Sequence, residues 1–222
     1  MVDFSLIALA SMLAAMAASY GPALLRALPE PDDAEPGKPT YAKLARTSRL
    51  AISLAVGAAL ITAAVGWRIG AEPILTAWAV LSVVGVLLAF IDWRTRLLPY
   101  RVVVPSTVVV GLLLVEAAVI DGAWDALLRS TLAGLAVFAA FFVSWWVLPR
   151  AVGYGDVRIS GMLGAMLGWH GWSTVFVGMY AAFLLGAVIG VGLAVAKVVD
   201  RKAIPFGPFL FAGTFLGVLI AP

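Results

Sequence analysis

The chain has 222 residues, of which 63% are hydrophobic and 12% are charged, and its formal net charge is +3. Soluble domains are about half apolar and about a quarter charged, so this composition excludes an ordinary water-soluble domain. Because the sequence contains no Cys, it also excludes disulfides, thiolate nucleophiles and Cys-ligated zinc.

Eight apolar stretches follow one another along the chain, and most approach the roughly 20 residues that cross a bilayer as a helix. They predict an all-α fold, a polytopic transmembrane helical bundle of about eight spans. The sixth stretch is short and rich in glycine, which is consistent with a tilted or partly re-entrant helix packed inside the bundle. The stretches are residues 4–25, 50–67, 74–91, 102–120, 126–148, 157–169, 173–196 and 206–221.

A single sizeable hydrophilic segment interrupts these stretches. Residues 29–40 are rich in proline and acidic side chains, which predicts a flexible linker, and residues 41–49 are basic. The basic part is either a short amphipathic piece attracted to anionic lipid or an ordinary solvated loop. We therefore expect a first transmembrane span at residues 1–28, a cytoplasmic loop at 29–49 and a transmembrane core at 50–222.

The distribution of Lys and Arg predicts the orientation of the chain. If the N-terminus lies outside, every basic residue except Arg68 and Arg129 falls on the inner side, as the positive-inside rule requires. This charge follows membrane topology and forms no patch suited to nucleic acid, so we expect a lipid bilayer and no nucleic acid as partner. The inner residues are Arg26, Lys38, Lys43, Arg46, Arg49, Arg94, Arg96, Arg101, Arg150, Arg158, Lys197, Arg201 and Lys202.

Two acidic residues stand out because the predicted topology puts both at the inner face. Asp92 closes the third apolar stretch and Asp156 opens the sixth. Two carboxylates that share one proton can divide the work of peptide hydrolysis, one as base towards water and the other as acid towards the carbonyl or the leaving amine. We therefore predict Asp92 and Asp156 as a catalytic pair that uses no metal and no cofactor.

The surroundings of the two aspartates also have plainer interpretations. Gly153 and Gly155 allow the close approach of an extended peptide chain near Asp156. Taken singly, however, Asp92 could cap a helix or pair with Arg94 or Arg96, and Asp156 could cap the N-terminus of a helix.

Three segments together resemble the type IV prepilin peptidases. Residues 92–99 resemble the first aspartate motif, residues 153–158 resemble the Gly-x-Gly-Asp motif, and residues 204–210 are similar to a segment near the family's C-terminus. Tyr100 stands where many members have Asn, and Arg158 where Lys is common. The residues that carry the motifs beside the two aspartates are Pro99, Gly153, Gly155, Arg158, Pro205, Phe206, Gly207 and Pro208.

This resemblance implies an aspartyl endopeptidase of the prokaryotic inner membrane, with Asp92 and Asp156 as its catalytic pair in a peptidase core at residues 50–222. Its substrate would be a type IV prepilin or pseudopilin, cut at the cytoplasmic face between a short basic leader and an apolar N-terminal helix. Members that also methylate the new N-terminus carry a longer first inner loop, often with two pairs of Cys that bind zinc. Because this chain has a short loop and no Cys, we expect a dedicated peptidase, of the kind that serves Flp or Tad-type pili.

Three other interpretations stay open at this point. A presenilin or signal-peptide-peptidase type of protease shares the two aspartates but carries a Pro-Ala-Leu motif near its C-terminus, where this chain has Phe206-Gly207-Pro208. A small transporter would use intramembrane acids to carry ions, and Glu116 is the acid that suggests one. A membrane scaffold would have no site at all. The oligomeric state is not predicted.

Overall fold

The computed structural model describes residues 3–30, 38–149, 152–195 and 204–221. All regular secondary structure within these ranges is helical, which confirms the predicted all-α fold. Contacts divide the chain into two compact units: unit 1 is Met1–Leu113 and unit 2 is Leu114–Pro222. The boundary lies inside helix α6 (Tyr100–Asp121), which therefore contributes to both units.

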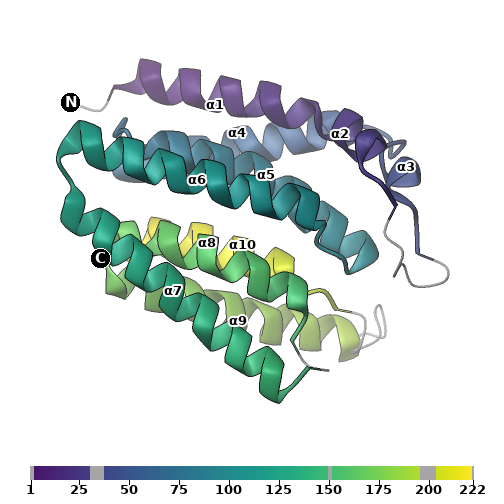
Figure 1. The fold of residues 1–222 in the computed structure, drawn as a ribbon. Helices are drawn as coiled ribbons and strands as arrows, with labels where there is room; N and C mark the ends of the chain where they lie inside the picture. Colours follow the sequence, from purple (N-terminus) through teal and green to yellow (C-terminus); the bar gives the residue numbers. More distant parts are fainter. Residues whose placement is uncertain (1–2, 31–37, 150–151, 196–203, 222) are drawn as a thin grey trace. The chain divides into compact units, whose positions relative to one another are not determined.

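Unit 1 contains α1 (Phe4–Ser19), α2 (Gly21–Ala27), α3 (Tyr41–Leu44), α4 (Leu50–Ile69) and α5 (Leu75–Thr95), with α1, α4 and α5 packed against one another (Figure 1). Small residues permit this packing. A Cβ added at Gly66 would lie 2.8 Å from a side-chain carbon of Ile7, and one added at Gly21 would collide with Leu54. The first predicted span is divided between α1 and α2 because Pro22, which has no N–H, is placed in the first turn of a new helix.

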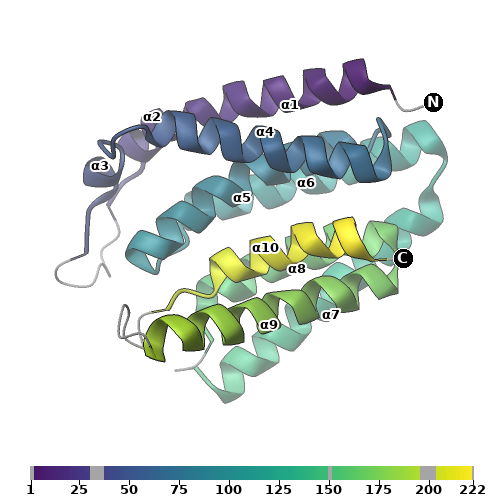
Figure 2. The same cartoon turned by 180° about the vertical axis from the view of Figure 1, so that it is seen from behind.

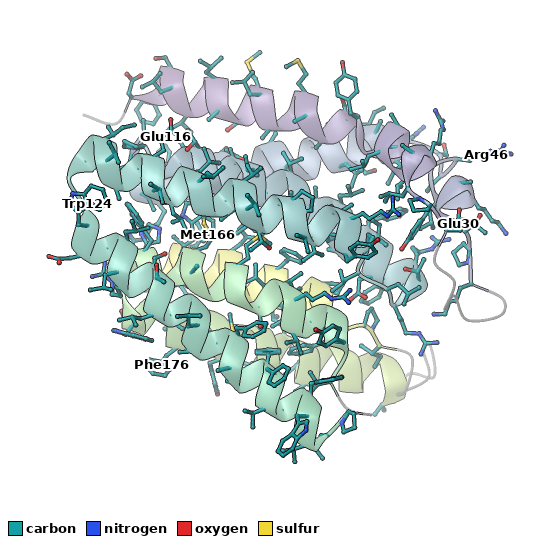
Figure 3. The ribbon with its side chains drawn as sticks, viewed as in Figure 1. Glu30, Arg46, Glu116, Trp124, Met166 and Phe176 are labelled. Carbon is teal, nitrogen blue, oxygen red and sulfur yellow. The ribbon has the colours of Figure 1, made fainter. Side chains whose placement is uncertain are left out.

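The predicted basic segment forms a short turn of helix with two different sides. Thr40 caps α3 by accepting a hydrogen bond from the Lys43 N–H at 3.2 Å, and the Glu30 carboxylate accepts from the Tyr41 N–H at 2.8 Å. Tyr41 and Leu44 are buried, while Lys43 and Arg46 are exposed. Figure 3 labels Glu30 and Arg46 at the end of unit 1 that contains α2 and α3. The segment therefore has one buried side and one exposed basic side, and its attraction to anionic lipid stays a prediction.

Unit 2 contains α7 (Trp124–Val147), α8 (Tyr154–His170), α9 (Trp172–Val195) and α10 (Gly207–Ile220). Helix α8 packs against α7, α9 and α10, and most of its residues are buried (Figure 2). Glycines make the α7–α8 contact close, since a Cβ at Gly164 would lie 2.7 Å from Val137 and one at Gly168 would lie 2.5 Å from Ala133. The sixth apolar stretch is thus a continuous helix packed inside the unit, and whether it is tilted or partly re-entrant in the membrane stays a prediction.

Three of the glycines in the seventh apolar stretch contact other parts of the same unit. Gly178 faces Leu167 and Gly213, Gly186 faces Phe206, and Gly190 faces Ile204, whereas a Cβ at Gly192 would meet nothing within 4 Å. Close helix packing, which these small residues favour, therefore occurs within one chain.

Six helical segments of the described chain are long and apolar enough to cross a membrane: Phe4–Ala27, Leu50–Ile69, Leu75–Thr95, Tyr100–Asp121, Trp124–Val147 and Trp172–Gly190. Helices α8 and α10 have 17 and 14 residues and fall below that length. Each of the eight predicted stretches is helical over most of its described length. The count of eight spans and the outer N-terminus stay predictions.

Helix boundaries differ from the predicted ones at both aspartates. Helix α5 continues to Thr95, beyond the predicted end at 91, and α8 begins at Tyr154, before the predicted start at 157. Hydropathy identifies only the apolar part of a helix. The helix itself continues as long as backbone hydrogen bonds form, and it ends where a residue such as Arg96 leaves the helical conformation. Arg150, Lys197, Arg201, Lys202 and most of the predicted linker lie outside the described residues.

Candidate functional site

Asp92 lies in the last turn of α5 in unit 1 and is 5% exposed. The helix ends there because Arg96 adopts a left-handed conformation (φ 60°), and the Arg96 N–H donates to the Asp92 carbonyl at 2.8 Å. The Thr95 hydroxyl then accepts from the Leu97 N–H at 3.2 Å. Asp92 is therefore held at a hydrogen-bonded corner between two helices.

Pro99 forms the other side of this corner. Its carbonyl accepts hydrogen bonds from the N–H groups of Val102 at 2.9 Å and Val103 at 3.0 Å, which starts α6. The first aspartate motif is thus a helix end, a short turn and a helix start. Proline suits this position because no intrahelical partner is needed from the N–H that it lacks.

The end of unit 1 that holds Asp92 also carries residues that the topology places inside. Helices α1 and α5 run towards this end, and α4 runs away from it (Figure 2). Gly21, the first residue of α2, therefore lies next to Leu54 of α4 and Leu87 of α5. The exposed side chains Arg26, Lys43 and Arg46 lie on α2, on α3 and just after α3. Within unit 1, Asp92 therefore shares its end with a basic surface.

Asp156 lies in the first turn of α8 in unit 2 and is 8% exposed. The N-cap residue is Gly153, whose carbonyl accepts from the Asp156 N–H at 3.0 Å, so the interpretation of Asp156 as the N-cap is wrong. A Cβ added at Gly153 would lie 3.2 Å from Oδ2 of Asp156. Gly153 thus leaves space for the Asp156 carboxylate itself, while Gly155 is the second residue of the helix.

A cavity of about 570 Å³ opens beside Asp156, and every residue that lines it belongs to unit 2. Asp156 and Ser144 are the residues in the lining with ionisable or hydroxyl side chains, and nearly all the others are apolar. The lining consists of Ala136, Val137, Ala140, Phe141, Ser144, Val152, Asp156, Trp172, Val175, Phe176, Met179, Phe183 and Phe206.

Three of the lining residues form an aromatic cluster: Phe141 on α7, Phe183 on α9 and Phe206 just before α10. Their ring centroids are separated by 6.1 Å (Phe141–Phe183), 5.2 Å (Phe183–Phe206) and 6.5 Å (Phe141–Phe206). Gly186 permits this arrangement, because a Cβ there would lie 2.9 Å from the Phe206 ring. Phe206 of the C-terminal motif is thereby brought to the cavity that Asp156 lines.

The other C-terminal motif residues build the start of α10. Pro205 and Gly207 are buried, Phe206 is the N-cap, and its carbonyl accepts from the Phe209 N–H at 3.0 Å. Pro208 occupies the first turn, where a missing N–H leaves no hydrogen bond unmade. The motif therefore positions Phe206.

Arg158 takes part in a second aromatic arrangement next to Asp156. Its guanidinium carbon lies 4.6 Å from the centroid of the Tyr154 ring, which lies 4.9 Å from the ring of Trp145 on α7. A cation over an aromatic face is attracted by the ring quadrupole. These contacts tie the first two turns of α8, and so Asp156, to the end of α7.

The sequence did not predict Phe141, Ser144, Phe176 or Phe183 as site residues. Their spacing along α7 and α9 is helical, but α7 beyond Thr131 and nearly all of α9 carry few polar side chains. No amphipathic pattern there separates a cavity-lining face from a lipid-facing one. Glu116, which suggested a transporter, is exposed on α6 (Figure 3). Within the described ranges, no three His, Asp or Glu side chains gather closely enough to hold a metal ion.

The two predicted catalytic residues belong to different units, Asp92 to unit 1 and Asp156 to unit 2. Each is buried near a helix end, and the predicted pairing of their carboxylates stays a prediction.

Comparisons with known proteins agree on one family. Residues 79–195, which include both aspartates, match the type IV leader peptidase family. The chain is 31% identical over 175 residues to a prepilin leader peptidase/N-methyltransferase of Pseudomonas putida, an alignment that covers 74% of this chain and 56% of that protein. It is 30% identical over 198 residues to the Aeromonas hydrophila protein of the same name, covering 82% and 59%.

A shorter relative is matched over most of its length. The chain is 36% identical over 149 residues to the leader peptidase HopD of Escherichia coli, covering 65% of this chain and 90% of HopD. In contrast, it spans only about half the length of the relatives named as peptidase/N-methyltransferases. No solved structure matches it significantly. On the family match and the HopD alignment together, this chain belongs to the type IV leader peptidase family.

Proposed function

We propose that the chain is an aspartic endopeptidase of the bacterial inner membrane that removes the leader from a type IV prepilin or pseudopilin. One observation carries the proposal: the matched region contains two buried aspartates at helix ends, one of which lines an apolar cavity. Buried ionisable groups in a membrane protein are energetically unfavourable and usually serve a function. The family match favours this function over a presenilin-type protease or a small transporter.

Two aspartates that share one proton divide the roles of general acid and general base. Asp156 lines the cavity, and we assign it the role of base towards water. Asp92, at the corner between α5 and α6, then takes the role of acid.

The proposed reaction then balances without a metal. Asp156 takes a proton from water while the water oxygen bonds to the scissile carbonyl carbon, and Asp92 gives its proton to the carbonyl oxygen. In the second step the carbon–nitrogen bond breaks, the leaving amine takes the proton held by Asp156, and Asp92 recovers its proton from the oxygen. The products are the leader with a free carboxylate and the mature pilin with a free amine.

The side of the membrane follows from the basic residues around each aspartate. Arg26, Lys43 and Arg46 lie at the Asp92 end of unit 1, and Arg158 lies two residues after Asp156. The positive-inside rule then assigns both ends to the cytoplasm, where the basic leader of the substrate also lies. The short first inner loop and the absence of Cys support a peptidase without methyltransferase activity.

The test follows leader removal from a purified prepilin by gel shift, with the protein in liposomes. Asp92→Asn and Asp156→Asn should each abolish cleavage, whereas Glu116→Gln, the same change at an exposed acid of α6, should cleave at the wild-type rate. Thermal unfolding confirms that each variant is folded. A single Asp→Asn variant that retains wild-type cleavage would overturn the proposal.

Disulfide trapping tests the pairing directly, because the chain has no native Cys. Asp92→Cys with Asp156→Cys should crosslink on oxidation, which requires the two Cα atoms to come within about 7 Å. Asp156→Cys with Leu128→Cys is the negative control, because Leu128 adjoins Arg129, whose guanidinium contacts the opposite end of α8. Failure of the first pair with a prepilin bound would refute the shared-proton mechanism.

A further inference from the structure

The cavity beside Asp156 has the form of a groove along two helices. Its α7 residues from Ala136 to Ser144 and its α9 residues from Trp172 to Phe183 recur every three or four positions, so each set lies on one helix face. The α9 side extends over about 16 Å, three turns of helix. The aromatic cluster connects the two walls.

The groove is chemically asymmetric. Phe141, Phe176 and Phe183 give it apolar walls, whereas Ser144 and Asp156 lie close to the junction between α7 and α8. Two of these aromatic side chains are also accessible: Phe176, labelled in Figure 3, is 70% exposed and Phe183 is 55% exposed. An occupant would therefore bury apolar surface along the groove and place a polar or positive group at the Asp156 end.

These features distinguish between two apolar occupants of a membrane groove. A phospholipid whose chains followed the walls would bring its phosphate near the Asp156 carboxylate, and two like charges there repel each other. A peptide that joins a basic segment to an apolar helix would instead bring positive charge near the Asp156 carboxylate. The peptide bond between the basic segment and the apolar helix would then lie beside this carboxylate.

We propose that this groove binds the apolar helix that follows the cleaved bond of the substrate, with Phe176 and Phe183 as specificity-determining residues. This inference rests on the proposed function. The helix would lie along α7 and α9 with its first residue near Asp156, so that its first three turns contact the groove. Substitutions in the first eleven or so substrate residues after the cut therefore affect cleavage, and substitutions further along do not.

The test compares two synthetic substrates that share the same basic leader and cleavage site. The long peptide continues with the full apolar helix, and the short peptide ends four residues after the cut. For Phe183→Ala and Phe176→Ala, kcat/KM for the long peptide should fall by about 5- to 30-fold, the range for truncating an interface anchor. The loss should appear in KM. Trp172 follows directly on the C-terminal end of α8, so Phe176 lies farther from Asp156 than Phe183 does. Four residues extend only about 6 Å along the groove, so kcat/KM of Phe176→Ala for the short peptide should not change.

Tyr180→Ala is the matched control. Tyr180 is an aromatic residue of α9 that is 69% exposed and lies outside the groove lining, so its removal should leave both peptides unaffected. If Phe176→Ala and Phe183→Ala cleave the long peptide as the wild type does, the groove does not bind the substrate helix. An equal loss on both peptides for Phe176→Ala would also overturn the inference, because it would indicate a general disturbance of the site.

Photo-crosslinking separates this inference from the proposed function. A benzoylphenylalanine placed at Phe176 or Phe183 in the Asp156→Asn variant should crosslink to the long peptide, and one placed at Tyr180 should not. This measurement needs no cleavage, so it also decides the inference if the wild-type protein cleaves neither peptide. Crosslinks to lipid alone would overturn the inference in favour of a lipid-filled groove.

Discussion

The backbone of Gly153 lies so close to the Asp156 carboxylate that a Cβ at Gly153 would be 3.2 Å from Oδ2. The Gly153 backbone has φ −72° and ψ 138°, which any residue can adopt. Glycine therefore leaves space for the Asp156 carboxylate here and is not needed for its backbone conformation. The second glycine of the motif, Gly155, is a helical residue.

Gly153→Ala should keep the fold but displace the Asp156 carboxylate by a few tenths of an ångström. Because misplacement of a reacting group by about 1 Å can reduce the rate about 100-fold, we expect kcat to fall about tenfold. The measurement is leader removal at saturating substrate, with the thermal midpoint as a check on folding. Gly111→Ala is the control, since a Cβ at Gly111 meets nothing within 4 Å. Equal kcat values for the two variants would contradict the prediction.

Replacing Arg158 should show whether its contact with Tyr154 helps to position Asp156. Arg158→Lys keeps a cation over the ring and should retain activity, whereas Arg158→Met removes it. At an exposed site this contact is worth about 0.5–1 kcal/mol, so we expect cleavage by Arg158→Met to fall two- to fivefold. Steady-state cleavage and the thermal midpoint are measured for both variants. Similar losses for Lys and Met would indicate that the guanidinium has another role.

Arg129 should stabilise the fold without affecting catalysis. Its guanidinium donates from Nε to the Gly168 carbonyl at 2.8 Å and from Nη2 to the Trp169 carbonyl at 2.6 Å, so it caps the C-terminal end of α8. Arg129→Met leaves both carbonyls without this donor and should lower the free energy of unfolding by about 2–4 kcal/mol. The free energy of unfolding of Arg129→Lys should lie between those of the wild type and Arg129→Met.

The readouts for Arg129 are unfolding in detergent and cleavage at a temperature where every variant is folded. Asp156 lies at the opposite end of α8, so kcat should stay at the wild-type value. A reduced kcat in a fully folded Arg129→Met protein would show that the cap also positions the catalytic end.

Gly213 should be among the least replaceable residues of unit 2. A Cβ there would lie 2.5 Å from both the Ala182 Cβ and the Gly178 carbonyl oxygen, and it would also meet the Ala182 backbone nitrogen. Because backbone cannot rotate away, Gly213→Ala must separate α9 from α10, at about 1–3 kcal/mol or more. Gly192→Ala, which meets nothing within 4 Å, should be neutral or slightly stabilising in the same unfolding assay. Equal stability of the two variants would be inconsistent with the packing described here.

The N-terminus of α1 should respond to acid. A hydrogen bond from the Ser5 hydroxyl and those from the Leu6 and Ser5 N–H groups hold the pKa of Asp3 below its ordinary value. A lowered pKa in the folded state means that this contribution is complete above the ordinary pKa, near 3.8, and is lost as the pH falls through the lowered value. Amide protection factors at Ser5 and Leu6 should therefore decrease upon acidification below about pH 4. In Asp3→Asn, which keeps a cap without a titrating group, they should not depend on pH.

The helical membrane fold and the two candidate aspartates could be predicted from the sequence alone. Apolar stretches of membrane-spanning length require a helical fold, because only a helix satisfies its own backbone hydrogen bonds in lipid. Asp92 and Asp156 could be identified because few acids occur next to such stretches. The motif around Asp156 also indicated close packing, although the neighbour of Gly153 is the aspartate and not a substrate.

The surroundings of Asp156 depend on tertiary structure. Phe141, Phe183 and Phe206 come from three segments distant in the sequence, and nothing in a uniformly apolar helix shows which side faces a cavity and which faces lipid. The same reason hides the contacts of Gly164, Gly178 and Gly213, since a glycine's role depends on the backbone that approaches it. The composition of the sequence thus determines that this protein is helical and surrounded by lipid. The packing of α7, α8, α9 and α10 against one another determines where the groove lies.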